Sequence, residues 1–168
     1  MKNLLKLIII TLIPVSYQAN ASVDEAFIAS CSVPKYKNLM PMIVRKESMN
    51  NPYAVNINAE VKIQKQPGSL ERAMSIVKML KNSEFNFDVG LSQVNSYHFR
   101  PGGFLSKKNF TVEDALDPCL NVLMGSLILD DAVRMAKGNL GQALSIYNTG
   151  HKEYGFRNGY VDRVLIDN

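Results

Sequence analysis

The chain has 168 residues and a formal net charge of +4, from 19 Lys and Arg against 15 Asp and Glu. This length predicts one domain with a hydrophobic core, and so small a charge argues against a nucleic-acid-binding protein. The two His stand alone and the two Cys form no Cys-x-x-Cys pair, which argues against a zinc site. We expect neither a metal nor an organic cofactor.

The beginning of the chain has the three parts of a secretory signal peptide in order. Two lysines form a basic start, an apolar run covers residues 7–15, and Ala19-Asn20-Ala21 is a small-x-small cleavage site. The run is too short to span a bilayer, and a buried N-terminal helix is the alternative. We therefore expect a signal peptide at 1–21, a single folded domain at 22–168 and no membrane span in the mature form.

Export would place the two cysteines, Cys31 and Cys119, in an oxidising compartment, where thiols usually pair. We therefore expect one disulfide between them. Because the bridge would close a long loop, it would stabilise the fold by about 4 kcal/mol in the chain-entropy model. Two separate buried thiols are the alternative.

Helical patterns with one extended stretch occupy the rest of the chain. The predicted elements of the first half are a short helix over 23–29, a helix over 38–48 capped by Asn38, an extended segment or small hairpin over 53–66, and a helix from the cap Ser69 to about Leu80. A polar segment covers 86–103. The second half predicts a capping box at 111–114, a long helix from Asp117-Pro118 to about Lys137, and helices over 140–147 and 160–165. The fold class predicted from these elements is a mostly helical domain with a small extended element.

Glu47 is the first candidate for chemistry. Leu39, Ile43 and Glu47 are spaced at four-residue steps, so the carboxylate continues the apolar stripe of its predicted helix. It also lies near the helix C-terminus, where the backbone dipole is negative. Both surroundings disfavour the ionised form and raise the pKa, as a general acid needs for cleaving a glycosidic bond. Position alone favours the alternative, an ordinary exposed Glu at a helix end.

Four segments resemble motifs of the lysozyme-like lytic transglycosylases, and they occur in the family's order. Residues 45–54, Arg-Lys-Glu-Ser-Met-Asn-Asn-Pro-Tyr-Ala, resemble the catalytic E-S-x-x-N-P-x-A motif, and residues 88–95, Asp-Val-Gly-Leu-Ser-Gln-Val-Asn, resemble the G-L-M-Q-I-N loop. Residues 147–150, Tyr-Asn-Thr-Gly, resemble Y-N-x-G, and 159–161, Gly-Tyr-Val, resemble the closing Y-V motif. The resemblance implies an α+β, predominantly α, lysozyme-like fold with a small β element.

In this family a single Glu serves as both acid and base, and the resemblance assigns that role to Glu47. It would protonate the oxygen between N-acetylmuramic acid and N-acetylglucosamine and then accept the proton of the muramic 6-hydroxyl, which closes a 1,6-anhydro ring without consuming water. The residues implied to bind substrate or to order the cleft are Ser48, Gln93, Asn95, Tyr147, Asn148 and Tyr160. The alternatives are a Ser48 hydroxyl bonded to backbone, Gln93 and Asn95 that hold their loop together, and Tyr147 in the core.

Further features resemble one branch of the family, the small periplasmic transglycosylases of type IV secretion and conjugation systems. These features are Cys31 ahead of the catalytic helix, Gln66-Pro67 ahead of the middle helix, and Asp117-Pro118-Cys119 at the start of the long helix. The resemblance implies a periplasmic location, peptidoglycan glycan strands as substrate, and periplasmic components of such a machine as partners.

Two residues of the second motif, Ser92 and Asp88, leave alternatives open. Ser92 stands where the family often has Met, which predicts a more polar sugar subsite beside it. Asp88, if it faced Glu47, would permit hydrolysis by two carboxylates, as in a lysozyme-type muramidase. The flanking Phe87 and Val89 favour instead a turn-ordering Asp that accepts local backbone amides. A non-catalytic peptidoglycan-binding assembly factor is the second alternative function.

Overall fold

A computed structural model describes residues 23–166 of the chain, so the signal peptide expected at 1–21 lies outside the described residues. Within that range the helices are α1 (Glu25–Cys31), α2 (Met40–Ser48), α3 (Leu70–Asn82), α4 (Pro118–Met135), α5 (Leu140–Thr149), α6 (Tyr154–Arg157) and α7 (Tyr160–Leu165). The strands β1 (Val55–Ile57), β2 (Phe87–Val89) and β3 (Val94–Asn95) form one antiparallel sheet in that order. The predicted class, α+β and predominantly helical, is confirmed.

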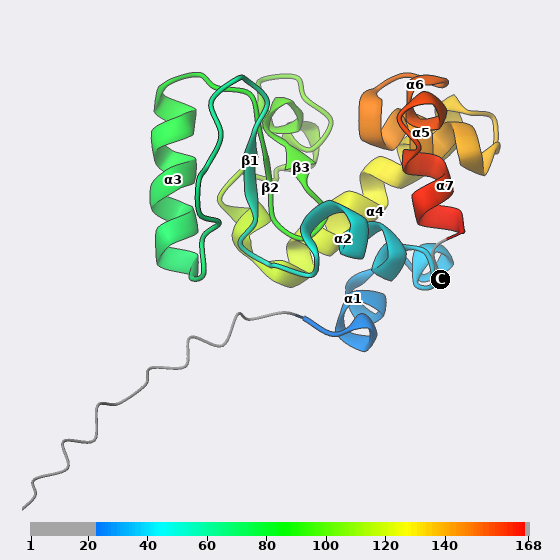
Figure 1. Ribbon diagram of the computed structural model, residues 1–168, viewed down its shortest axis with the longest axis horizontal. Coiled ribbons are helices and arrows are strands. Elements are labelled where there is room, and N and C mark those ends of the chain that lie inside the picture. Colours follow the sequence, from blue (N-terminus) through cyan, green and yellow to red (C-terminus); the bar gives the residue numbers. More distant parts are fainter. Residues whose placement is uncertain (1–22, 167–168) are drawn as a thin grey trace, which may run out of the picture.

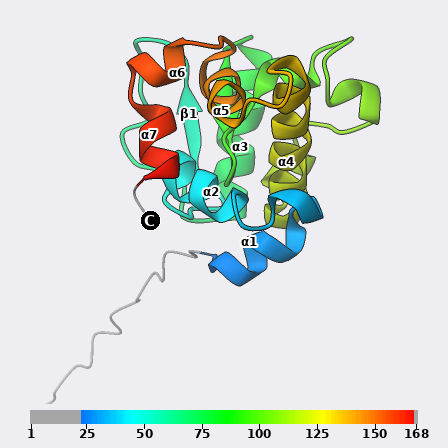
Figure 2. The same ribbon diagram turned by 90° about the vertical axis from the view of Figure 1, so that its right-hand side faces the viewer.

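The long helix α4 passes between two groups of elements (Figures 1 and 2). The sheet and α3 lie on one side of it, and α5, α6 and α7 lie on the other. Each group has its own core, and α4 contributes to both: Val122 and Leu129 pack with α1, α2, α5 and α7, whereas Met124 packs with the sheet and α3. This double role is the reason why α4 is apolar on most of its circumference.

Several helix starts agree with the predicted caps. The Ser69 hydroxyl accepts the backbone N–H of Arg72 at 3.3 Å, and the Asp117 carboxylate accepts that of Leu120 at 2.8 Å. These contacts satisfy backbone donors that have no partner inside the helix. The capping box at 111–114 also forms, since each of its two end residues accepts the other's backbone N–H. The element that it begins is a single 3-10 turn.

In the first half one prediction was wrong and another was confirmed only in part. Asn38 does not cap α2, because the helix begins at Met40 and Leu39 occupies the cap position without a side-chain bond. The segment 53–66 is extended at β1, as predicted, but it contains no hairpin, because β1 pairs with β2, far along the chain. The free edge of β1 is instead covered by one side chain, the amide of Gln66, which both accepts from and donates to the backbone of Val55 at 2.9 Å. An amide side chain thus replaces the neighbouring strand.

The disulfide between Cys31 and Cys119 is confirmed, and it joins the end of α1 to the first turn of α4. The two residues are 88 positions apart in the sequence. Since α1 packs against both α2 and α4, the bridge fixes the position of α1, against which α2 packs. None of the helices in the described range combines the length and the apolar character needed to cross a membrane.

Candidate active site

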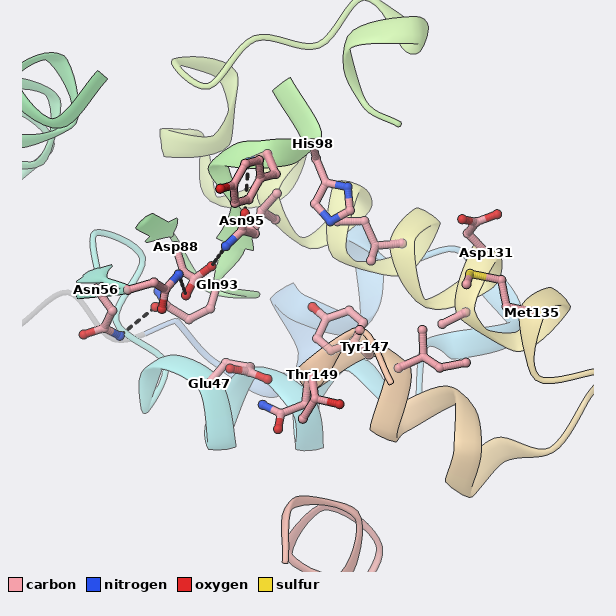
Figure 3. Close-up of a pocket in the computed structure, with 18 residues that line it drawn as sticks. Glu47, Asn56, Asp88, Gln93, Asn95, His98, Asp131, Met135, Tyr147 and Thr149 are labelled. Carbon is pink, nitrogen blue, oxygen red and sulfur yellow. Dashed lines mark hydrogen bonds between the residues drawn. The ribbon is translucent and has the colours of Figure 1, made fainter. Parts of the chain in front are cut away.

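A cleft of about 740 Å³ lies between the sheet and the helices α2, α4 and α5 (Figure 3). Its sheet wall is lined by Asn56, Asn58, Asp88, Gln93 and Asn95, its helical wall by Glu47, Tyr147, Asn148 and Thr149, and its far end by His98, Asp131 and Met135. A second hollow of about 700 Å³ continues on the other side of Glu47, which lines both. Glu47 therefore lies part-way along a groove that can take a polymer on either side.

Glu47 occupies the last turn of α2, as its sequence position predicts. Burial raises the pKa of its carboxyl from 4.5 to about 7, and the negative charge of Asp88 contributes to this rise. Both effects disfavour the ionised form. An acid with a pKa near neutrality can both give and take a proton at neutral pH, which is the property that general acid–base catalysis requires.

Tyr160 holds this acid in place. Its hydroxyl donates to Glu47 Oε1 at 2.5 Å, from the first residue of α7. The bond favours the carboxylate and so lowers the pKa of Glu47, against the larger effect of burial. The pKa of Tyr160 itself is raised by burial and by Glu47, so the phenol stays a donor. Only 4% of the surface of Tyr160 is exposed, so this residue contacts Glu47 from the protein interior and does not line the cleft.

The loop that carries Gln93 is held by Asn121, a fully buried side chain on α4. Asn121 Nδ2 donates to the carbonyl oxygens of Val89 and Ala115, and its Oδ1 accepts the backbone N–H of Ser92 at 2.7 Å. Gly90 has φ +78°, and a Cβ there would lie 2.1 Å from Asn121 Nδ2, so only glycine fits this turn. Sequence reasoning missed Asn121, which no motif marks.

Gln93 and Asn95 both line the cleft, but much of their bonding capacity is used within the protein. Gln93 Nε2 donates to the carbonyl of Gly90 at 2.8 Å, and its Oε1 accepts from Asn56 Nδ2 at 2.7 Å. Asn95 Nδ2 donates to Asp88 Oδ1 at 2.7 Å, and its Oδ1 accepts the backbone N–H of Tyr97. These bonds match the loop-holding alternative, and contacts of the two amides with sugars remain a prediction.

The turn-ordering role predicted for Asp88 is wrong. Asp88 lies on β2, and its side chain lies on the cleft wall opposite Glu47 (Figure 3). Its carboxylate accepts from the side-chain amides of Asn58 and Asn95, not from local backbone N–H groups. The apolar neighbours Phe87 and Val89 are buried because a strand alternates its faces, and the same alternation turns Asp88 toward the cleft.

Ser92 does not make a sugar subsite more polar, because its side chain is 1% exposed and faces α4. A Cβ built on Gly125 would lie 2.5 Å from both Ser92 Cβ and Ser92 Oγ, so the two residues meet where the loop crosses the helix. Because Gly125 has no side chain, the backbone of the loop that carries Ser92 can approach the backbone of α4 closely. The substitution therefore concerns packing between the loop and α4 rather than the sugar-binding surface.

The remaining predicted residues surround the acid. The Ser48 hydroxyl donates to the carbonyl of Val44 at 3.1 Å, which matches the backbone-bonded alternative, while the residue lines the second hollow. Tyr147 lines the cleft, and its hydroxyl donates to the carbonyl of Ser92 at 2.8 Å, so that α5 holds the loop. Asn148 Oδ1 accepts from Asn158 Nδ2 at 2.9 Å and links α5 to the segment before α7. It also lines the cleft.

A family model described as "Transglycosylase SLT domain" matches residues 28–167. The chain belongs to this family. The match spans α2 with Glu47, the loop with Gln93 and helix α7 with Tyr160. It confirms the family predicted from the four motifs and, with it, the lysozyme-like fold class.

The chain is also similar to several curated proteins. The chain is 34% identical over 148 residues to the type IV secretion system protein virB1 of Brucella abortus, covering 80% of this chain and 59% of the relative. It is 30% identical over 146 residues to the protein virB1 of Agrobacterium fabrum, covering 82% and 56%. The invasion protein IagB of Salmonella typhimurium is 31% identical over 97 residues, covering 56% and 58%. The chain thus spans less than two thirds of the relatives it matches, and no solved structure matches it.

Proposed function

We propose that this chain is a peptidoglycan lytic transglycosylase, which cleaves the β-1,4 bond between N-acetylmuramic acid and N-acetylglucosamine and leaves a 1,6-anhydro muramic end. One observation carries the proposal: Glu47, with a pKa of about 7, lies part-way along a groove that continues on both sides of it. Membership of the transglycosylase family supports the same reaction.

Glu47 carries out both proton transfers. Its protonated carboxyl gives a proton to the glycosidic oxygen as the bond from that oxygen to the muramic anomeric carbon breaks, which frees the 4-hydroxyl of N-acetylglucosamine. The resulting carboxylate then takes the proton of the muramic 6-hydroxyl, whose oxygen bonds to the same anomeric carbon. The acid returns to its starting state, and no water is consumed. A pKa near neutrality suits this double role because each protonation state is accessible.

The cellular setting is inferred from the relatives. The chain resembles two virB1 proteins, one of them named as a type IV secretion system protein. We infer that it acts in the periplasm as a single catalytic domain over 22–168, after export through the signal peptide at 1–21. There it opens the wall locally for assembly of a secretion or conjugation apparatus, whose periplasmic components are its partners. The disulfide supports an oxidising compartment.

The runner-up is a muramidase that hydrolyses the same bond, and the position of Asp88 on the cleft wall favours it as the alternative. A non-catalytic assembly factor has less support. A factor that only binds glycan has no need of a half-buried carboxyl with a raised pKa, and holding such a group costs folding free energy.

Mass spectrometry of digested peptidoglycan distinguishes these functions. We expect wild type to release muropeptides that end in anhydro-muramic acid, each lighter by one water than its hydrolysed counterpart. Reducing ends alone would make the chain a muramidase, and undigested glycan would favour the assembly factor. The Glu47→Gln variant is the negative control, from which we expect no released muropeptides.

Replacing Tyr160 by Phe removes the hydrogen bond that favours ionised Glu47. The pKa of Glu47 then rises further, so the alkaline limb of the pH–rate profile moves up by about one pH unit, the value of one hydrogen bond to a charged group. We also expect kcat to fall about tenfold because the acid is less well oriented. Initial rates between about pH 4 and pH 9 measure the two effects.

The matched control is Tyr154→Phe, at a tyrosine that is half exposed on α6. It should leave both limbs of the profile unchanged. An alkaline limb that stays in place or moves to lower pH in Tyr160→Phe would contradict the assigned role of the phenol.

A further inference from the structure

Asp88 is a half-buried carboxylate that has no cationic partner among the residues that the structure describes. Burial raises its pKa, and the two groups that counter this are the neutral amides of Asn58 and Asn95. Their Nδ2 atoms lie 2.8 Å from Oδ2 and 2.7 Å from Oδ1 of Asp88, so one donor holds each oxygen. Among the ion pairs of the described residues none involves Asp88. A charge taken out of water is normally paired with an opposite charge, whereas the Asp88 carboxylate is held by neutral amides alone.

The charge acts across the cleft. Asp88 belongs to β2, yet its negative charge raises the pKa of Glu47 on α2 and that of Tyr147 on α5. Figure 3 shows Asp88 and Glu47 on opposite walls, with the space for substrate between them. A sugar bound there has the proton donor on one side and a fixed anion on the other.

Glycosidic cleavage gives the anomeric carbon and the ring oxygen positive charge in the transition state. We propose that Asp88 is a catalytic residue of this cleft, the anion that stabilises the positive charge of the muramic ring between departure of the leaving oxygen and closure of the anhydro ring, and that Asn58 and Asn95 hold it in position. This deepens the proposed function and rests on it. Asp88 forms no bond to carbon and exchanges no proton, so the atom balance of the reaction is unchanged.

The two amides also explain why Asp88 serves as a fixed charge. By donating to both oxygens, Asn58 and Asn95 favour the ionised carboxylate against the effect of its burial and fix its orientation before substrate arrives. A preorganised charge of this kind stabilises a transition state without having to reorient. The anion, Asp88, thus lies on the sheet, and the acid, Glu47, lies on a helix.

Other titratable groups around the acid must be taken into account in a pH experiment. The groups that face or flank Glu47 are Asp88 on β2, Tyr147 on α5, Tyr160 on α7, and Arg45 and Lys46 on its own helix. Of these, Asp88 is the one whose charge raises the pKa of Glu47. Removing that charge therefore has a distinctive signature.

The test compares pH–rate profiles on isolated glycan strands, with anhydro ends counted by mass spectrometry. In wild type, activity needs Asp88 ionised and Glu47 protonated, which gives a bell-shaped profile whose limbs belong to the coupled pair. In Asp88→Asn we expect kcat to fall about 100-fold with little change in KM. The acidic limb should disappear, and the alkaline limb should move to lower pH because Glu47 loses a neighbouring negative charge.

Asn58→Ala is the second variant, at an exposed side chain that can be removed without disturbing the core. Losing this donor raises the pKa of Asp88, so the acidic limb should move to higher pH while the alkaline limb keeps its place. Glu71→Gln, which removes one exposed negative charge on α3, is the matched control and should overlay wild type. Circular dichroism and thermal unfolding identify a variant that fails to fold.

Limbs at the wild-type pH values in both folded variants, whatever the loss of rate, would overturn the role of Asp88 and leave a purely structural one. That result is separate from failure of the proposed function, which shows in wild type itself as reducing ends or no cleavage. A covalent adduct between glycan and Asp88 in intact-protein mass spectra would also overturn the inference, in favour of a nucleophile.

Discussion

Replacing Glu47 by Gln is expected to lower kcat for glycan cleavage by about 1,000-fold or more, with KM close to that of wild type. General acid–base catalysis contributes about 10²–10⁴-fold, and here one carboxyl serves both proton transfers. Gln keeps the shape and can still bond to Tyr160, but it has no proton to exchange at any accessible pH. Quantified release of anhydro muropeptides measures the loss, and a zymogram gives the qualitative result.

The same substitution should make the protein more stable at alkaline pH, which separates loss of chemistry from loss of fold. The pKa of Glu47 is about 7 in the folded protein, against 4.5 for an unperturbed Glu, so the folded state holds the proton more tightly. Its contribution to the unfolding free energy is present in full below the lower pKa and is lost as pH rises through the folded pKa. A shift of about 2.5 pKa units corresponds to about 3 kcal/mol at most.

We therefore expect Glu47→Gln to gain about 1–3 kcal/mol over wild type at about pH 8 and to match it near pH 4. Urea unfolding at the two pH values measures this, with Glu71→Gln as the control that should gain nothing. Activity within tenfold of wild type, or a stability gain that is the same at both pH values, would contradict the role of Glu47.

The sequence predicted those parts of the fold that depend on local chemistry. Ser69 and Asp117 cap their helices by contacts within three residues, so the pattern alone located the starts of α3 and α4. The sheet depends on distant contacts: β1 pairs with β2 in a segment whose polar composition showed no sign of a strand. The amide of Gln66 completes the edge of β1, and no periodicity reveals that a side chain replaces a strand.

The candidate site divides in a similar way. Glu47 could be predicted because the motif around it and its place in the apolar stripe both lie within one short segment, and burial of that stripe is the main cause of its raised pKa. Asp88 and Ser92 were misjudged because the direction of each side chain depends on which face of its strand or loop another element covers. Asn121 was missed for the same reason: its amide partners are backbone groups of segments that pack against α4, which the sequence of the helix does not reveal.

Removing the disulfide with the double substitution Cys31→Ala and Cys119→Ala is expected to lower the unfolding free energy by about 4 kcal/mol, because a bridge across 88 residues restricts the unfolded chain strongly. For a domain of this size, that loss corresponds to a fall in Tm of about 10 °C. Differential scanning calorimetry with and without a reductant measures it. Reductant should lower the Tm of wild type toward that of the variant and leave the variant unchanged.

Loss of the disulfide should also affect glycan cleavage at higher temperature. The bridge holds α1 against α2, which carries Glu47. At low temperature the variant should cleave glycan at nearly the wild-type rate, since packing still positions the acid. Activity should then disappear about 10 °C earlier on heating, in step with unfolding. A variant whose Tm stays within about 2 °C of wild type would mean that contacts of α1 with α2 and α4 hold this end of the molecule without the covalent link.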